Sequence, residues 1–162
     1  MPIVNADDLE WTTGGPGDGP TFERKKLAAA AGGEDIGCSL YELPAGKRSW
    51  PYHYHTANEE AIYVLAGEGT LRAPDGEHDI VAGDYVTLPA DGSGGHRVLN
   101  DSDEPLRYLA VSTMHEPDVT MYPETDKVGV FVGAPPGGRS GRDFQAYFPE
   151  NAGVEYWEDD KE

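Results

Sequence analysis

The sequence predicts a single all-β domain, with short strands that close into a barrel or a sandwich. Its 21 glycines and 13 prolines separate short apolar runs at close intervals, a pattern typical of many short strands joined by turns. Helical periodicity is nearly absent, because residues 25–31 offer only a few helix formers before Gly32 and Gly33 end them. The length of 162 residues is sufficient for one domain with its own core.

Nine apolar or β-branched segments are bounded by turn residues, and each is expected to form a strand. Pro74-Asp75-Gly76 joins two of these strands as a hairpin, in which we expect Asp75-Gly76 to supply the positive φ angles of a type I′ turn. Closing the strands into a barrel removes exposed sheet edges. In chain order the expected strands are residues 37–43, 52–55, 60–65, 70–73, 78–81, 85–88, 96–99, 106–113 and 128–132.

The third expected strand has an apolar residue on each of its faces, because successive side chains of a strand point to opposite sides. Ile62 and Val64 share one face, and Tyr63 and Leu65 share the other. If Tyr63 and Leu65 are exposed they need a cover, which the N-terminal segment, the C-terminal tail or the sheet of a second subunit can provide. Aromatic residues are in excess at both ends of the chain, and we expect a homodimer.

Two segments rich in Gly and Pro divide the chain into three parts. Residues 14–20 and 133–141 are expected to be flexible connectors. We therefore expect a flexible N-terminal arm at residues 1–20, a β-barrel at residues 21–132, and a linker with an aromatic, acidic tail at residues 133–162. Because this tail carries aromatic residues among its acids, we expect it to dock on the barrel or on a partner chain.

Acidic residues dominate the composition. Asp and Glu number 30 against 12 Lys and Arg, which gives a net charge of −18. Nucleic acids and anionic membranes are polyanions whose binding needs clustered cations, so neither is an expected partner. The charges are spread along the chain, and we interpret them as the solvated acidic surface of a protein from a halophile. An ordinary acidic protein from a mesophile is the alternative.

The remaining compositional signals favour a cytoplasmic protein. Cys38 is the single cysteine, so no internal disulfide can form, and its neighbours indicate a small core residue in preference to a nucleophile. The N-terminus has no basic start and no apolar run of signal-peptide length. No segment approaches the length of a membrane span.

His53, His55, Glu60 and His96 carry the chemistry predicted for this chain. Side chains two apart on a strand point to the same face, so His53 and His55 bring two imidazoles to one spot while Tyr54 faces away. Glu60 can return to that face once the chain has bent and begun a new strand. Imidazole and carboxylate suit the divalent first-row metals as ligands.

The surrounding residues resemble the cupin superfamily, whose members are small antiparallel β-barrels. The first cupin motif has the form G-x5-H-x-H-x(3,4)-E-x6-G. In this chain His53, His55, Glu60 and Gly67 match the motif, and Gly46 lies one residue further upstream than the motif places its first glycine.

The second cupin motif has the form G-x5-P-x-G-x2-H-x3-N and resembles residues 83–100. Gly83, Pro89, His96 and Asn100 fit it. The interval from Pro89 to His96 is longer than the family form by two residues, and this insertion lies in a turn, where insertions are tolerated. The match adds His96 to the set of imidazole ligands.

Both motifs in order make residues 21–132 similar to a cupin and imply a double-stranded β-helix, or jelly-roll barrel. They also imply a metal site of three imidazoles and one carboxylate, with one or two positions open for substrate, water or dioxygen. We expect one divalent transition metal, which can be Fe, Mn, Ni, Co, Zn or Cu, because all of them suit these donors. The alternative is that the four side chains are polar core residues that hydrogen-bond to one another.

Cupins with a similar ligand set include dioxygenases, isomerases and lyases, as well as sensors and storage proteins without turnover. We therefore expect a metal-dependent enzyme that acts on a small polar organic molecule. The alternatives are a non-catalytic, metal-dependent protein that binds or senses a sugar-like molecule, and a metal-free structural cupin. Catalysis needs a second titratable group beside the metal, and the nearby candidates are Tyr52, Tyr41, Glu42 and Arg48.

A phosphosugar substrate is disfavoured, because no large cluster of basic residues accompanies the motifs. Lys47-Arg48 is the only basic pair near the first motif. The longer run, Arg24-Lys25-Lys26, lies far upstream and is interpreted as a solvated face.

Overall fold

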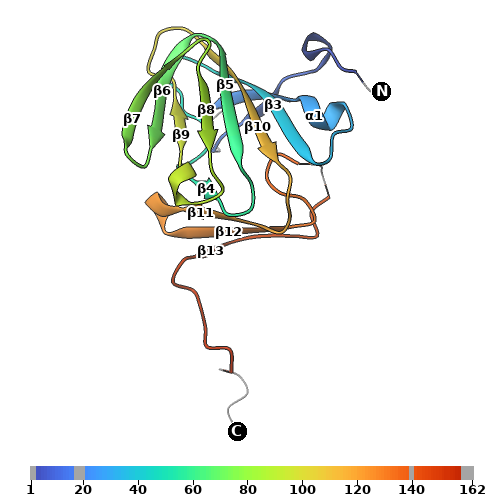
Figure 1. Cartoon of the computed structure of the whole chain (residues 1–162), viewed down its shortest axis with the longest axis vertical. Helices are drawn as coiled ribbons and strands as arrows, with labels where there is room; N and C mark the ends of the chain where they lie inside the picture. Colours follow the sequence, from blue (N-terminus) through green and yellow to red (C-terminus); the bar gives the residue numbers. More distant parts are fainter. Residues whose placement is uncertain (1–2, 17–20, 139–140, 158–162) are drawn as a thin grey trace.

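The computed structural model describes residues 3–16, 21–138 and 141–157. Within these ranges the strands form three antiparallel sheets that wrap around one interior (Figure 1). The largest sheet has the order β1 (Thr12–Gly14), β2 (Phe22–Lys26), β3 (Ile36–Leu43), β10 (Leu106–Thr113), β5 (Glu60–Ala66) and β8 (Tyr85–Leu88). A smaller sheet has the order β7 (Gly76–Val81), β6 (Glu68–Ala73) and β9 (Arg97–Leu99).

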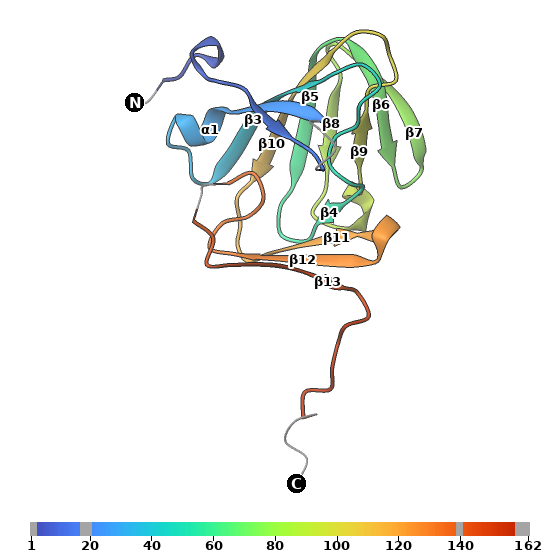
Figure 2. The same ribbon diagram turned by 180° about the vertical axis from the view of Figure 1, so that it is seen from behind.

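The third sheet lies across one end of the barrel, as Figures 1 and 2 both show. Its order is β13 (Phe144–Pro149), β12 (Lys127–Val132), β11 (Asp118–Tyr122) and β4 (Tyr54–His55). Beyond β13 the chain runs away from the barrel (Figure 2). Tyr156 and Trp157 are exposed there and contact each other edge to face, with ring centroids 4.7 Å apart.

The core is formed by inward-facing residues of the six-stranded sheet and of the three-stranded sheet β7-β6-β9. On β3 burial alternates along the strand, so Ser39, Tyr41 and Leu43 face inward. This period of two is what a strand with one face in a core requires. The core cluster consists of Phe22, Tyr41, Leu43, Ile62, Val64, Leu71, Ile80, Leu88, Val98, Leu106 and Tyr108.

The all-β, jelly-roll fold predicted from the sequence is confirmed, and each of the nine expected strands corresponds to a strand of the structure. Four further strands were missed: β1, β2, β11 and β13. β2 was missed because its sequence, Phe-Glu-Arg-Lys-Lys, is mostly charged and is followed by helix formers. The helix itself, α1 (Leu27–Ala30), is a single turn.

The hairpin between β6 and β7 is confirmed, but the expected turn type is wrong. Ala73 pairs with Gly76, so the two central residues of the loop are Pro74 and Asp75. A type I′ turn needs positive φ at both central residues, whereas the proline ring fixes φ near −65°. Of the residues in this turn, Gly76 alone has a positive φ, at 137°, and it already belongs to β7.

The expected parity of β5 is confirmed. Ile62 and Val64 are 3% and 1% exposed, whereas Tyr63 and Leu65 are 42% and 44% exposed. Tyr85 on the neighbouring strand β8 pairs with Tyr63 and is also exposed. The outer face of the large sheet therefore carries a group of apolar side chains that the described residues leave open to solvent.

The two ends of the chain are only partly described. Of the segments expected to be connectors, residues 17–20 and 139–140 lie outside the described residues, as do residues 1–2 of the arm and 158–162 of the tail. Within the arm, β1 pairs with β2, and Trp11 lies 4.5 Å from the ammonium of Lys25. The described residues contain no helix of the length and apolarity needed to cross a membrane.

Candidate metal centre

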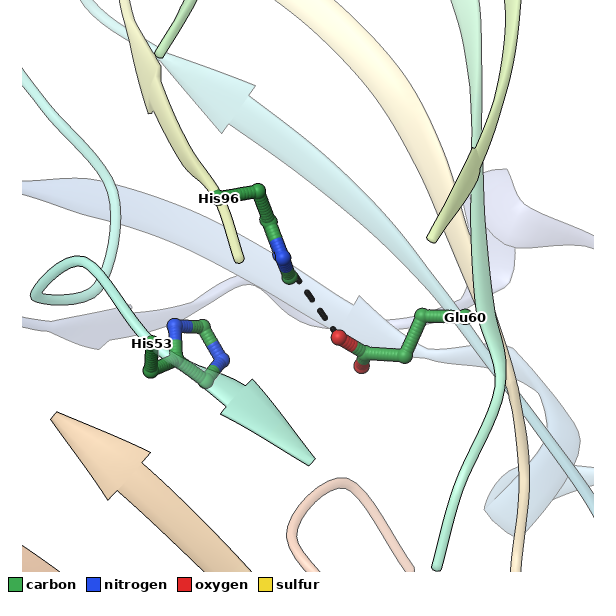
Figure 3. A group of neighbouring side chains, drawn as sticks. All are labelled: His53, Glu60 and His96. Atoms are coloured by element: carbon green, nitrogen blue, oxygen red, sulfur yellow. Dashed lines mark ion pairs between the residues drawn. The ribbon is translucent and has the colours of Figure 1, made fainter. Parts of the chain in front are cut away.

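Three side chains with metal-binding atoms meet inside the barrel. His53, Glu60 and His96 each offer one donor atom, and these atoms all lie within 4.8 Å of one another (Figure 3). His53 and His96 are held side by side because their backbones form an antiparallel bridge, with N···O distances of 3.1 and 2.9 Å. Glu60 is the first residue of β5, in the six-stranded sheet, and approaches the two imidazoles from the other side of the group.

His55 adds a further imidazole beside this group. The Nε2 atoms of His55 and His96 each lie 3.6 Å from Oε2 of Glu60. The ring centroids of His53 and His55 are 5.2 Å apart. The structure therefore brings all four predicted ligands to one place, with His53, Glu60 and His96 as the tightest group.

Each of the three imidazoles is oriented by a hydrogen bond from its other nitrogen. A backbone carbonyl only accepts, so Nδ1 of His53 and His96 carries the proton and Nε2 presents a lone pair. This arrangement, in which Nδ1–H donates to an oxygen while the other nitrogen stays free, is typical of metal-binding histidines. The Nδ1 acceptors are Pro51 O for His53 at 2.8 Å, Asp118 Oδ2 for His55 at 2.6 Å, and Gly94 O for His96 at 3.0 Å.

The electrostatics of the group suit a cation. Burial, together with the neighbouring imidazoles, lowers the pKa of His53 well below its ordinary value, and burial likewise lowers the pKa of His96. At neutral pH these rings are therefore uncharged and present lone pairs toward the Glu60 carboxylate, and metal binding requires that protonation state. For His53 and His96 this arrangement fits a divalent metal better than a direct hydrogen bond to Glu60, because neither Nε2 has a proton to donate to the carboxylate.

Asp118 supports the group and was missed in the sequence. It is 0% exposed, and its Oδ2 accepts hydrogen bonds from His55 Nδ1 and from Thr120 Oγ1, the latter at 3.1 Å. Burial disfavours a charged His55, but the Asp118 hydrogen bond and the charge of Glu60 outweigh burial and raise the His55 pKa. The alternation of inward Asp118 and Thr120 with outward Val119 is the signal that could have identified β11.

The group opens into a cavity of about 330 Å³. Aromatic side chains form much of its wall, including Tyr41, Tyr108, Tyr122 and Tyr147. Burial raises the pKa of Tyr108 and of Tyr122, so both hydroxyls stay protonated at neutral pH and can donate hydrogen bonds to a ligand. Glu60 is the one carboxylate on the cavity wall among the described residues.

Of the candidates for a second titratable group, only Tyr41 lines this cavity, where its ring stacks on Tyr108 at 5.2 Å. Tyr52 packs under the guanidinium of Arg72, which lies 5.3 Å from the centre of its ring, and does not line the cavity. Glu42 forms an ion pair with Arg107 on the partner strand. Arg48 bridges to Leu99 through its backbone and does not line the cavity.

The interpretation of Arg24-Lys25-Lys26 as a solvated face is wrong. These residues belong to β2, so their side chains alternate, and Arg24 and Lys26 both line the cavity. Lys25 points the other way, is 7% exposed and donates a hydrogen bond to the carbonyl oxygen of Ala6 at 2.8 Å. A third cation, Arg142, reaches the cavity from the segment before β13. The argument against a phosphorylated substrate therefore no longer holds.

Comparison with known proteins agrees with the fold and the motifs. Residues 39–112 match the family model of the cupin domain. A cupin-superfamily sugar phosphate isomerase from Silicibacter pomeroyi is 26% identical and has a TM-score of 0.77 over 93% of this chain and 94% of that chain. A protein from Acidithiobacillus ferrooxidans, provisionally described as a sugar phosphate isomerase, is also 26% identical, with a TM-score of 0.77 over 94% and 95%.

A polyketide cyclase from Streptomyces resistomycificus is more distant, and the likeness to it shows a shared fold alone. It is 22% identical, with a TM-score of 0.59 over 70% of this chain and 79% of that chain. No curated protein sequence matches the chain.

Proposed function

Since this chain is a member of the cupin superfamily, we propose that it is a divalent-metal-dependent enzyme that isomerises a small polar organic molecule. The observation that carries the proposal is the convergence of three oriented imidazoles on the Glu60 carboxylate at the wall of a cavity. Two structures that share 26% identity over nearly the whole chain are named as sugar phosphate isomerases, one of them provisionally. These names favour isomerisation over dioxygenase and lyase chemistry.

The proposed ligands are His53, His55, Glu60 and His96, with Asp118 fixing the ring of His55. This donor set is compatible with several first-row metals and does not select among them. When bound, such an ion supplies a Lewis acid that polarises a carbonyl or hydroxyl oxygen of the substrate.

The side chains of the cavity perform the remaining tasks. The protonated hydroxyls of Tyr108 and Tyr122 donate hydrogen bonds that orient the oxygen atoms of a polar substrate. The apolar parts of Ile62, Leu88 and Val98 exclude water from the interior wall. Isomerisation of a hydroxy-carbonyl compound moves a proton between neighbouring carbon atoms, and that transfer needs a base on the wall.

The lack of a separate base on the described cavity wall supports a second candidate function, which is metal-dependent binding or sensing without turnover. Glu60 is the one carboxylate on the described wall, and it is itself a proposed ligand. The wall tyrosines Tyr108 and Tyr122 are donors at neutral pH instead of bases, because burial raises their pKa values. A site without a separate base suits a binding protein.

The metal assignment is tested by elemental analysis of protein expressed without a histidine tag. We expect about one transition-metal ion per chain, and a sharp loss in His53→Ala and in His96→Ala, because a site with an open position has few ligands to spare. His78→Ala is the matched control, since His78 pairs with Asp75 on the surface. Equal metal content in all four proteins would refute the assignment.

Turnover is tested by proton NMR in D2O with small hydroxy-aldehydes and hydroxy-ketones. An isomerase exchanges the hydrogen atom beside the carbonyl group for deuterium, and the exchange should depend on the metal. A protein that binds metal and ligand without exchange would support the second candidate function.

A further inference from the structure

Three cationic side chains share the cavity with the metal-binding group. Arg24 and Lys26 project from the same face of β2, and Arg142 comes from the segment between β12 and β13. Burial and the positive charges of Arg24 and Arg142 lower the pKa of Lys26, so the three cations on this wall repel one another. Two distant parts of the chain therefore deliver positive charge to one wall.

None of these three cations forms an ion pair with a described residue. Arg142 donates to neutral oxygens only, namely Ala134 O at 2.8 Å, Pro135 O at 3.1 Å and Gln145 Oε1 at 2.7 Å. Arg24 donates to the hydroxyl of Tyr41 at 3.5 Å, and its Nε is buried without any hydrogen-bond partner. No hydrogen bond or ion pair of the Lys26 ammonium occurs among the described residues.

The charge balance of the chain makes this arrangement informative. Asp and Glu number 30 against 12 Lys and Arg, so acidic partners outnumber basic side chains. Other cations of the described structure do pair with carboxylates, as Arg72 does with Glu124 and Arg107 with Glu42. Within the cavity Glu60 is the one carboxylate of the described wall, so positive charge is in excess there. Cations gathered without counter-charges cost free energy unless a ligand supplies the negative charge.

We propose that Arg24, Lys26 and Arg142 form a subsite that holds the phosphate group of a small phosphorylated substrate. This proposal rests on the proposed function, which assigns the reaction to the other side chains of the cavity. It adds the chemical class of the substrate. A phosphate monoester carries close to two negative charges at neutral pH and three terminal oxygens, which matches three cationic donors. A carboxylate offers one charge and two oxygens, and leaves more of the positive charge uncompensated.

The two arginines are held in place before any ligand arrives. The guanidinium of Arg24 lies 6.0 Å from the ring centre of Tyr41 and 5.8 Å from that of Trp50. The guanidinium of Arg142 lies 5.1 Å from the ring centre of Phe131. Planar guanidinium groups fixed by aromatic rings and backbone carbonyls lose little freedom on binding phosphate, so they favour affinity.

The test is calorimetric titration of inorganic phosphate into metal-stripped protein, at neutral pH and an ionic strength held constant with KCl. Wild type is expected to bind phosphate. Each of Arg24→Gln, Lys26→Gln and Arg142→Gln should bind it about tenfold more weakly or worse, since each removes a charged hydrogen-bond donor. Lys127→Gln is the matched control, because Lys127 is exposed on β12 and its loss changes the net charge equally. The control should stay within about twofold of wild type, because an exposed charge outside the subsite is screened.

Three further measurements make the test decisive. Lys26→Arg restores the charge and should restore binding, which separates a lost cation from a damaged fold. Acetate should bind more weakly than phosphate, and D-ribose 5-phosphate should bind while D-ribose does not. Absence of phosphate binding to wild type, equal binding by the subsite variants, or equal binding of acetate would each overturn the proposal.

The outcome is independent of the metal assignment. Metal is absent from the titration, so a chain that binds no metal can still show the phosphate subsite. A chain that binds metal through His53 and His96 can equally fail to bind phosphate, and that result would remove the subsite while leaving the proposed metal centre intact.

Discussion

Replacing Asp118 by Asn is expected to weaken metal binding although Asp118 is not one of the proposed ligands. Asp118 Oδ2 accepts from His55 Nδ1 at 2.6 Å, and Oδ1 accepts from the Ala57 amide at 3.3 Å. The substitution keeps the size of the side chain and removes its negative charge, which makes the Nε2 lone pair of His55 a weaker donor. An amide nitrogen placed toward Nδ1 would in addition force the ring to turn.

The expected magnitude follows from the position of Asp118 directly behind His55, a proposed ligand. Loss of such a supporting carboxylate lowers metal affinity by about 10- to 100-fold. Each tenfold step corresponds to about 1.4 kcal/mol. The effect should fall near the upper end of this range, because Asp118 is 0% exposed and water cannot compensate for the lost negative charge.

The assay is a competition titration of Zn²⁺ between the protein and a chromophoric chelator, for wild type and Asp118→Asn. Asp75→Asn is the matched control, because Asp75 also pairs with a histidine, His78, at 2.8 Å but on the surface. Thermal melts of the metal-free proteins establish that each variant is folded at the temperature of the titration. The control is expected to leave the affinity within about twofold of wild type.

A His55→Ala background separates support of a ligand from general damage to the site. If Asp118 acts through His55, then Asp118→Asn should have no further effect once His55 is absent. Wild-type affinity in Asp118→Asn, or the same fold-loss with and without His55, would refute the reasoning.

Four other predictions can be checked independently. The melting temperature should rise as KCl is raised to molar concentration, because the Debye length falls from about 30 Å at 0.01 M to about 3 Å at 1 M and screens the net charge of −18; a flat or falling curve, also in His53→Ala, would contradict the halophilic interpretation. Light scattering should give a dimer, and Tyr63→Glu on the exposed face of β5 should give a monomer; a monomeric wild type would contradict this. Burial raises the Cys38 thiol pKa, so its thiolate fraction at pH 8 is smaller in the native than in the unfolded chain, and iodoacetamide should alkylate the native protein more slowly than the urea-unfolded one. Leu43→Ala should lower the free energy of unfolding in urea by about 2–5 kcal/mol, because Leu43 is 0% exposed.

The motif residues could be predicted from the sequence because each one meets a constraint that few residue types can satisfy. Gly67 has a φ of 80°, and a Cβ there would lie 2.5 Å from the carbonyl oxygen of Pro105. Asn100 is 1% exposed and donates to the carbonyl oxygens of Leu43 and Glu104, both at 2.8 Å. Such constraints fix a residue type at a fixed spacing, so the pattern predicts the barrel and the proposed ligand group.

The rest of the site could not be predicted, because it depends on contacts between distant segments. Arg24 and Lys26 alternate on a strand whose charged sequence carries no apolar signal. Arg142 belongs to a segment whose place beside the cavity follows from the pairing of β13 with β12. Asp118 was missed together with its strand, because it is far from His55 in the sequence and only the fold brings the two residues into hydrogen-bond contact.

The positions of the cavity cations relative to the matched domain separate two properties of this protein. The proposed metal ligands all lie within residues 39–112, whereas Arg24, Lys26 and Arg142 all lie outside that range. Chains that share the matched domain can therefore keep one set of candidate metal ligands while their termini diverge. Grafting β2 and the segment around Arg142 onto another cupin is accordingly expected to transfer the proposed phosphate subsite without rebuilding the proposed metal centre.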